Sequence, residues 1–410
     1  MNKPIERYQT ELSQQLLPFW KKAIDTEYGG VYTCFSNDGA QLISKRKYIW
    51  SQGRFLWIAC KLQQLQNENR LTDDFQWNRV AKQTYEFLRK NALMDNRHVV
   101  FAVEKDGRHI ADQMDTSIFA DCFYVLGCNA YADLQQDKQV FEHAYAIYQK
   151  INNRIDHQTF KSDPYPIPKG YTSHSIAMIL LNVAQELYIT ATSFSKEYEQ
   201  ALERDQLILI NRILDEFVTG SRIKELKHSQ AAGDTLLERH INPGHTLESV
   251  WFMLHSLQGL QQEKQETITK IEEVAKQALE LGWDQQDGGL FRFIDHLGGE
   301  PTGILIDTPY EQLIHDTWNL KLWWPHAEAL YTTKLLESIT GKTEWTNYYE
   351  QIERYALATF PQTDPAIREW IQIRSRDGTP LEKVVALPVK DPFHIIRSFI
   401  LLIELQERKK

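Results

Sequence analysis

The chain has 410 residues, of which 42% are hydrophobic and 25% charged, values typical of a folded globular protein rather than a disordered or collagen-like one. Its 46 Lys and Arg stand against 55 Asp and Glu, a net charge of −9, and the absence of any basic run argues against a nucleic-acid-binding protein. No apolar stretch reaches the roughly 18 residues that span a membrane, and the first residues lack the apolar core of a secretion signal. We therefore expect a cytoplasmic protein with neither nucleic acid nor membrane as partner.

Apolar residues recur at helical spacing along six stretches, and charged amphipathic segments alternate with them. In chain order the apolar stretches are 55–65, 113–133, 172–191, 245–261, 313–338 and 393–406, and the clearest amphipathic ones are 137–153, 196–216 and 264–281. Two concentric rings of helices would bury the first set and leave one face of the second exposed.

Short segments with turn residues separate the helices. They lie at 28–39, 99–107, 155–168, 220–233, 287–298 and 370–378, and four of them combine glycine with a β-prone run that predicts a hairpin. Six breaks predict twelve helices in six pairs and hence one all-α domain over residues 1–410, an (α/α)6 barrel with short β-hairpins in its connecting loops. An open helical solenoid is the alternative, although it would require stronger similarity between the repeats.

Charged and aromatic residues gather at the start of the apolar helices, which in a barrel places them at one mouth. The first group is Lys47, Trp50, Gln52 and Arg54. An arginine beside tryptophans in an apolar helix is costly unless it meets a polar ligand, so Arg54 is a candidate for binding a hydroxyl or stabilising an oxyanion. The alternative is a structural arginine that bonds loop carbonyls.

Two histidines each have a charged neighbour three residues away, on the same helical face. Glu248 follows His245, close to Trp251, and a carboxylate beside an imidazole orients the ring and tunes its basicity. Arg397 follows His394, which pairs a base with an oxyanion binder. We expect Glu248 to orient His245.

Further candidates are Trp324 with Glu328, which suggest an aromatic platform with a hydrogen-bonding carboxylate or, alternatively, packed indoles in a Pro-kinked helix. Asp115 is expected to be a carboxylate at a helix N-terminus, and His174 either lines the mouth or caps a helix. No phosphate loop, dinucleotide fingerprint or HExxH motif appears, and the four cysteines contain no CxxC pair. We therefore expect reduced thiols and neither a metal nor a redox cofactor.

These motifs, in this order, resemble the N-acylglucosamine 2-epimerase family. The matching stretches are GGVYTCFSNDG (29–39), the residues Lys47, Trp50, Gln52, Arg54 and Trp57, IFADCF (118–123), NPGHTLESVWF (242–252), DGGLFRFID (287–295), KLWWPHAEAL (321–330) and FHIIR (393–397). Members fold as (α/α)6 barrels, in agreement with the count of helix pairs. The amino-acid sequences of the NPGH and WWPHAEAL segments are more similar to those of the N-acyl enzymes than to those of cellobiose 2-epimerases.

The resemblance implies interconversion of N-acetyl-D-glucosamine and N-acetyl-D-mannosamine by inversion at C2. It implies that His245 and His394 are the acid–base pair and that Arg54, Glu328 and Arg397 support the substrate and an enolate-type intermediate. The other residues that we expect to contact the sugar are Trp50, Trp251, Trp324, Lys47, Gln52, Asp115 and His174. The family commonly forms homodimers, and many members are activated by ATP, for which this sequence offers no phosphate-binding loop.

Three alternatives stay open. A cellobiose 2-epimerase, or an aldose–ketose isomerase such as a mannose isomerase, would use the same barrel and the same histidines. An (α/α)6 glycoside hydrolase would need two carboxylates across the scissile bond, drawn from Glu248, Glu328 and Asp115. A non-catalytic sugar-binding protein would leave the histidines and arginines unexplained.

Overall fold

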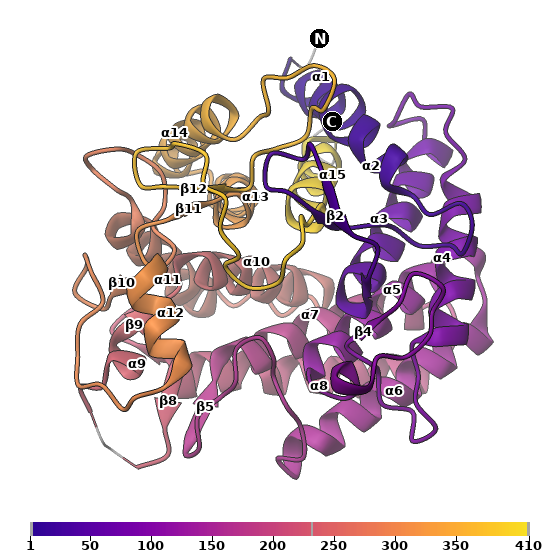
Figure 1. Ribbon diagram of the computed structural model, residues 1–410. Coiled ribbons are helices and arrows are strands. Elements are labelled where there is room, and N and C mark those ends of the chain that lie inside the picture. Colours follow the sequence, from indigo (N-terminus) through magenta and orange to yellow (C-terminus); the bar gives the residue numbers. More distant parts are fainter. Residues whose placement is uncertain (1–2, 231–232, 408–410) are drawn as a thin grey trace.

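Six helices that are apolar on nearly all sides form an inner ring, and six more helices surround them (Figure 1). The computed structural model describes residues 3–230 and 233–407. The inner helices are α3 (Ile49–Asn67), α5 (Ile118–Gln135), α7 (His174–Ala191), α10 (Pro243–Gly259), α13 (Trp323–Thr340) and α15 (Phe393–Glu407). Each inner helix contacts the next, and α15 contacts α3, so that the ring closes.

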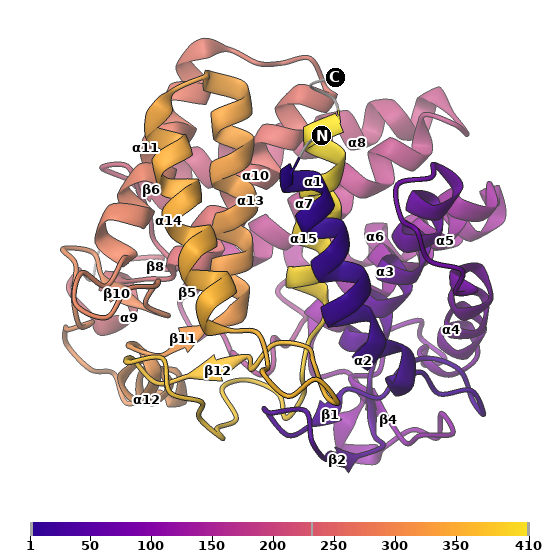
Figure 2. The same cartoon turned by 90° about the horizontal axis from the view of Figure 1, so that it is seen from above.

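Each outer helix packs mainly against one inner helix, and α4 and α6 also contact the next one. They are α1 (Lys3–Thr10), continued by a π-helical turn (Glu11–Leu16) and α2 (Leu17–Ala23), then α4 (Trp77–Asn91), α6 (Lys138–Asp156), α8 (Lys196–Arg212) with a π-helical turn (Ile213–Phe217), α11 (Gln265–Gly282) and α14 (Thr343–Thr359). This arrangement confirms the predicted all-α (α/α)6 barrel. The two ends of the chain meet where α1 packs on α15 (Figures 1 and 2).

The sequence patterns explain which helices lie inside. Every side chain of α5 from residue 118 to residue 132 is buried, because this helix has neighbours on both sides. The next helix, α6, buries the stripe Val140, Phe141, Ala144, Ile147, Tyr148, Ile151 and Arg154 and exposes its opposite face. A helix with one apolar stripe is stable only with that stripe turned inward, which fixes its place in the outer ring.

Close packing between α3 and α5 depends on two glycines. A Cβ atom on Gly127 would lie 2.5 Å from the carbonyl oxygen of Gly53, and one on Gly53 would collide with the backbone of Phe123. The two helices therefore approach each other closely at this level. Arg54 directly follows Gly53, so the same contact positions Arg54 beside Phe123.

Short strands join neighbouring loops at the end of the barrel where the inner helices begin. Four ladders pair the segment before an inner helix with the following loop: β3 (Lys47–Tyr48) with β4 (Ala102–Val103), β5 (Tyr171–Ser173) with β8 (Leu226–His228), β9 (His240–Ile241) with β10 (Ile294–Asp295), and β11 (Lys321–Leu322) with β12 (Ile373–Arg374). β1 (Cys34–Phe35) with β2 (Leu42–Ser44) and β6 (Val218–Thr219) with β7 (Arg222–Ile223) are local pairs. The predicted short β-hairpins in the connecting loops are confirmed, since β1 pairs with β2 and isolated antiparallel bridges close further local turns, such as Val103 with His109 and Arg374 with Pro380.

A buried lysine anchors each Gly-Gly turn. Lys47 Nζ donates to Asp25 (2.6 Å) and to the carbonyl of the first turn (2.7 Å). Lys321 Nζ does the same at the second turn, with Asp284 (3.1 Å) and a glycine carbonyl (3.2 Å). Gln52 follows Lys47 by five residues, and His326 follows Lys321 by five. Each accepts a hydrogen bond from the backbone N–H of the residue just after its turn. The repeated hairpin motif therefore reflects a structural clamp.

Two further details differ from the sequence analysis. The stretch 313–338 contains two helices, because a short peripheral helix, α12 (Pro309–Thr317), ends before β11 and α13 begins after it. Another short helix, α9 (Leu236–Arg239), lies in the loop before α10.

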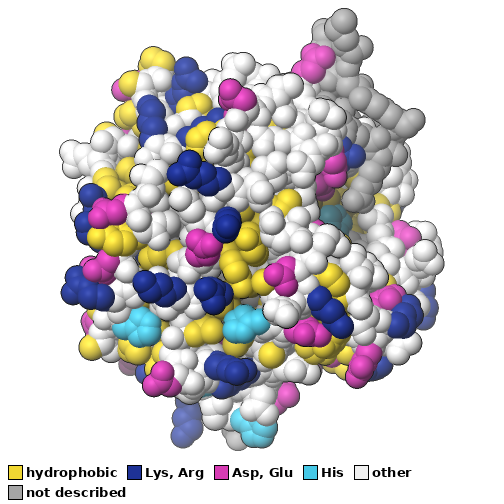
Figure 3. Space-filling view, turned by 90° about the vertical axis from the view of Figure 1, so that its right-hand side faces the viewer, with side chains coloured by type: hydrophobic (Ala, Val, Ile, Leu, Met, Phe, Trp, Pro, Cys, Tyr) yellow, Lys and Arg dark blue, Asp and Glu magenta, His cyan; other side chains and the backbone are white. Residues whose placement is uncertain are grey.

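No helix among the described residues is long and apolar enough to cross a membrane. On the face drawn in Figure 3, side chains of both charges are interspersed.

Candidate active site

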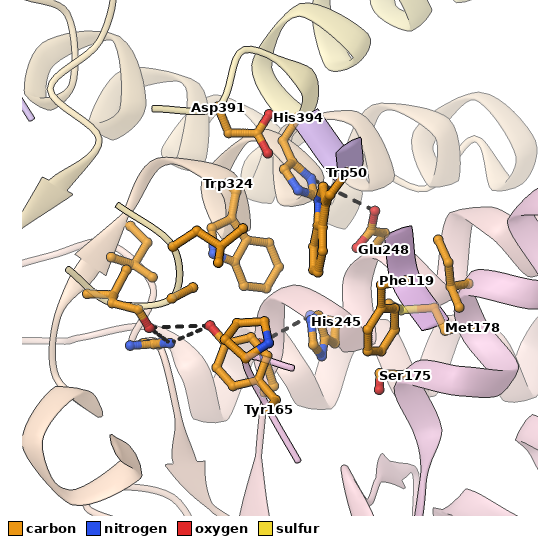
Figure 4. Close-up of a pocket in the computed structure, with 18 of the residues that line it drawn as sticks. Trp50, Phe119, Tyr165, Ser175, Met178, His245, Glu248, Trp324, Asp391 and His394 are labelled. Atoms are coloured by element: carbon orange, nitrogen blue, oxygen red, sulfur yellow. Dashed lines mark hydrogen bonds and ion pairs between the residues drawn. The ribbon is translucent and has the colours of Figure 1, made fainter. Parts of the chain in front are cut away.

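A pocket opens at the end of the barrel where the strands and long connections gather. Its walls come from the first turns of inner helices and from the loops between them. The predicted site residues that line it are Trp50, Arg54, His245, Glu248, Trp324 and His394. Figure 4 shows His245 and His394 in this one cavity. The Trp324 ring lies against both histidines, with centroids 5.2 Å from His245 and 5.5 Å from His394.

His245 is held by a carboxylate from a distant loop. Its Nδ1 lies 3.0 Å from Glu225, which sits between β7 and β8. Because a carboxylate only accepts, we assign the Nδ1 proton to the imidazole, which leaves Nε2 as the second acid–base atom. Although burial alone lowers the pKa of His245, the charge and hydrogen bond of Glu225 outweigh it and raise that pKa above its usual value.

Glu225 is shared by two imidazoles. Its second oxygen lies 3.8 Å from Nδ1 of His174, which is fully buried and whose Nε2 bonds Ser249. Burial raises the pKa of the Glu225 carboxyl, but His245 and His174 outweigh it and lower that pKa well below the usual value. The carboxylate is therefore charged across the physiological range. His174 supports Glu225 from behind and does not line the pocket.

His394 has its own carboxylate. Its Nδ1 lies 2.7 Å from Glu328 on α13, whose other oxygen accepts from the Trp251 indole at 2.7 Å. Arg397 donates to Glu328 (2.8 Å) and to Glu248. Burial raises the pKa of Glu328, but Arg397 and His394 outweigh it and lower the pKa. Both histidines thus share one arrangement, with Nδ1 on a carboxylate and Nε2 left for a ligand.

Arg54 is enclosed by aromatic rings and bonded to a carboxylate. Its guanidinium lies 4.0 Å from the Phe123 ring and 4.8 Å from Trp50, and it donates to Asp391. Burial lowers the pKa of Arg54, opposed by the charge of Asp391. The pair puts a positive and a negative group in the pocket wall. This partner is the acid just before α15 and not the loop carbonyls considered above.

One acidic cluster has the composition of a metal site. Ligand atoms of Glu248, Glu328 and His394 lie within 4.8 Å of one another. The Arg397 guanidinium already donates to both carboxylates, so their charge is balanced by a protein cation. A divalent ion would have to displace Arg397, and the arrangement fits an ion-pair network better than a metal centre.

The predicted residues other than His174 fall into four groups. Six line the pocket, as named above, and Trp251, Glu328 and Arg397 lie directly behind them. Lys47 and Gln52 clamp the first Gly-Gly turn instead of binding a ligand. Asp115 lies outside the pocket, bonded to Arg154 at 2.6 Å.

The expectation that Glu248 orients His245 is not what the structure shows. His245 bonds Glu225, and Glu248 is held by Arg397. Spacing along a helix places two residues on one face but does not choose between neighbours on the same helix and groups from loops. Pocket residues that the sequence analysis missed include Glu225, Asp391, Tyr165 and Arg292. The segment Lys390–Asp391–Pro392 next to His394 was the one available signal for Asp391.

The closed helical barrel and two carboxylate-supported histidines in an aromatic pocket define an enzyme that carries out acid–base chemistry on a small polar ligand. The model of the N-acylglucosamine 2-epimerase (GlcNAc 2-epimerase) family matches residues 30–398. The chain therefore belongs to this family of sugar epimerases.

Known proteins agree with this assignment. The N-acylglucosamine 2-epimerase of Bos taurus is 28% identical over 420 aligned positions, which cover 98% of this chain and 90% of that protein. The structure of the cellobiose 2-epimerase from Spirochaeta thermophila has a TM-score of 0.78 at 16% identity, over 99% of this chain and 97% of that one. A D-mannose isomerase structure has a TM-score of 0.77 at 13% identity, over 98% of both chains. At these identities the structures show the fold alone.

Proposed function

We propose that this protein interconverts N-acetyl-D-glucosamine and N-acetyl-D-mannosamine by inverting C2. The observation that carries the proposal is the presence of two histidines in one pocket, each bonded through Nδ1 to a buried carboxylate. The relatives that match nearly the whole chain are named N-acylglucosamine 2-epimerases, which supports this substrate pair.

The chemistry needs two proton-transfer groups. In the open-chain sugar the C1 carbonyl makes the C2 proton acidic, so one neutral imidazole removes it and an enolate-type intermediate forms. A protonated imidazole on the other face then returns a proton to C2, and the reverse reaction exchanges the two roles. Because both Nδ1 atoms are bound to carboxylates, each histidine can serve as acid or base through Nε2.

The pocket also supplies groups for the oxygen atoms of the sugar. Arg54 lies in the wall and stabilises negative charge that develops on the carbonyl oxygen. Glu248, held by Arg397, accepts a hydrogen bond from a sugar hydroxyl. Trp324, between the two histidines, offers its face to the C–H groups of the chain.

A glycoside hydrolase fits this pocket less well. Such an enzyme needs one carboxyl group that holds a proton at neutral pH. The pocket carboxylates Glu225, Glu248 and Asp391 are each bonded to a histidine or an arginine. For Glu225 this bonding lowers the pKa well below its usual value. Cellobiose 2-epimerase and mannose isomerase activities use the same histidine pair, so a sugar panel separates them from the proposed reaction.

The test is incubation with N-acetylmannosamine in D2O, followed by NMR. We expect N-acetylglucosamine with deuterium at C2, and we expect His245→Asn and His394→Asn each to reduce kcat by about 10² to 10⁴, the usual value of a general acid–base group. His143→Asn is the matched control, since His143 on α6 bonds Tyr124 outside the pocket. Full activity in either pocket variant, or turnover only of cellobiose or mannose, would contradict the proposal.

The proposal also includes a cellular location, an oligomeric state and an activator. We place the enzyme in the cytoplasm, in agreement with its four cysteines, which are all free and buried. We also propose a homodimer, which sedimentation would test. Activation by ATP is tested by repeating the assay with and without ATP, because an activator changes the rate without changing the product.

A further inference from the structure

Two loops without regular secondary structure meet at the pocket. Residues 162–168 and 382–389, here called the roof, both contribute to its lining. In Figure 1 the second loop lies between β12 and α15 and crosses the centre of the ring. Tyr165 of the first loop donates to the carbonyl of Val385 in the second, at 3.3 Å.

Arg292 joins the two parts of the roof. It is 3% exposed and lines the pocket. Its guanidinium donates to the Val385 carbonyl (2.9 Å), to the Tyr165 hydroxyl (3.1 Å) and to Thr317 on α12 (2.8 Å). All three acceptors are neutral, so the buried guanidinium bridges uncharged groups.

The second loop has few other anchors. Residues 382–389 make no backbone-to-backbone hydrogen bond with any described residue. Glu382 accepts from the backbone N–H groups of Asn37 and Asp38, and Lys383 donates to Asp316, so these bonds hold only the start of the loop. Over the pocket, the loop is held by the hydrogen bonds at the Val385 carbonyl and by the packing of Val385, Leu387 and Val389 on the core.

We infer that Arg292 is a specificity-determining residue that holds the roof in place and limits the substrate to one sugar unit. This inference rests on the proposed function. With the reducing end of a sugar at the two histidines, a second unit linked to its far end requires room that the roof occupies. The family includes enzymes named for a disaccharide, so the position of these loops separates two substrate classes on one barrel.

The test compares kcat/KM for N-acetylmannosamine and for cellobiose in the wild type and in Arg292→Ala. We expect a wild-type ratio of at least about 10², and a ratio reduced at least tenfold in the variant, through a higher KM for the monosaccharide and gained turnover of the disaccharide. Hydrogen exchange of residues 382–389 should rise at the same time. Arg292→Lys and Tyr165→Phe, which keep part of the contacts, should give intermediate ratios and serve if the alanine variant does not fold.

Arg374→Ala is the matched control. Arg374 is also a buried arginine that bonds a carbonyl, but its acceptor, Gly378, lies in its own hairpin. Its removal should leave the ratio unchanged. An unchanged ratio in Arg292→Ala with a more exchangeable roof, or a wild type that epimerises both sugars equally, would overturn the inference while leaving the epimerase proposal intact. A wild type that epimerises no sugar would instead overturn the proposed function.

Discussion

Among the pocket residues, Glu225 has the role that is hardest to predict from the sequence. It lies in a short loop between two strands, and no motif marks it, yet its carboxylate binds the Nδ1 atom of His245 and lies near His174. In acid–base enzymes a carboxylate behind the imidazole fixes the tautomer and the direction of the second nitrogen. We therefore treat Glu225 as a positioning residue for His245.

Glu225→Gln should reduce kcat about 10- to 100-fold and move one limb of the pH–rate profile to lower pH. The sign follows from charge: Glu225 raises the pKa of His245, so its neutral amide lets that pKa fall. The shift is toward acid whether His245 acts as the acid or the base. Titration of the His245 ring by NMR would measure it directly.

Glu272→Gln is the control for this prediction. Glu272 is a buried carboxylate on α11 that bonds Lys342 and Trp345, outside the pocket. Glu272→Gln should change the stability of the fold without moving either limb of the pH–rate profile. If Glu225→Gln lowered kcat with no movement of the profile, Glu225 would have only a packing role.

At the scale of elements, the sequence predicted the helices well and the contacts between loops poorly. The single buried stripe of α6 places it in the outer ring, and the mostly apolar sequence of α5 places that helix in the inner ring, since each pattern is satisfied in only one of the two. The pairings Lys47 with Asp25 and His394 with Glu328 join residues 22 and 66 positions apart. Such partners depend on how loops fold over the barrel end, which no local periodicity encodes.

The same limit explains the misplaced candidates. Lys47 and Gln52 lie next to Trp50 and Arg54 in sequence, and the two groups were assigned together. Lys47 is on strand β3, and Gln52, although on α3, bonds the backbone of Val31. Of the four residues, only Trp50 and Arg54 line the pocket. The helix spacing of His394 and Arg397 did place both in one network, because these two residues share a face of α15.

The two Gly-Gly clamps allow a prediction about pH. Burial, and to a smaller extent the charge of Lys321, lower the pKa of His326 to about 3. The neutral ring accepts the N–H of Leu290. The unfolded chain thus binds more protons than the native one between pH 6.5 and 3, and stability falls as pH falls through this range. The linkage relation gives a loss of about 2 kcal/mol between pH 7 and pH 5 from this group.

His326→Gln should remove this pH-dependent loss. Gln52 performs the same function in the first clamp, where its side-chain oxygen accepts from Val31, so a glutamine has precedent at this position. We expect denaturant titrations to show near wild-type stability at pH 7 and a smaller decrease at pH 5. His326→Ala, which leaves a buried N–H unpaired, should cost about 1 to 3 kcal/mol at pH 7. An unchanged decrease in the glutamine variant would assign the acid sensitivity to other groups.

At the scale of the whole molecule, the first and last helices close the barrel together. The main buried cluster contains residues from Tyr8 at one end of the sequence to Leu405 at the other, and two smaller clusters lie outside it. Tyr8 packs on Phe399 of α15, with ring centroids 5.1 Å apart. The helix that carries His394 therefore has its outer support at the opposite end of the sequence. We propose on this basis that residues 1–410 form a single domain.

Leu12→Asp tests this proposal. Leu12 is fully buried in the π-helical turn that contacts α15, and an unpaired carboxylate there should cost about 3 kcal/mol or more. We expect a lower Tm and a loss of epimerase activity, although Leu12 is distant in sequence from the residues that line the pocket. Gln14→Asp, two residues along on the exposed side, should change neither. If Leu12→Asp unfolded the first helix and left kcat and the main melting transition as in the wild type, the N-terminal helix would be a separate unit and the barrel would not need it to hold His394.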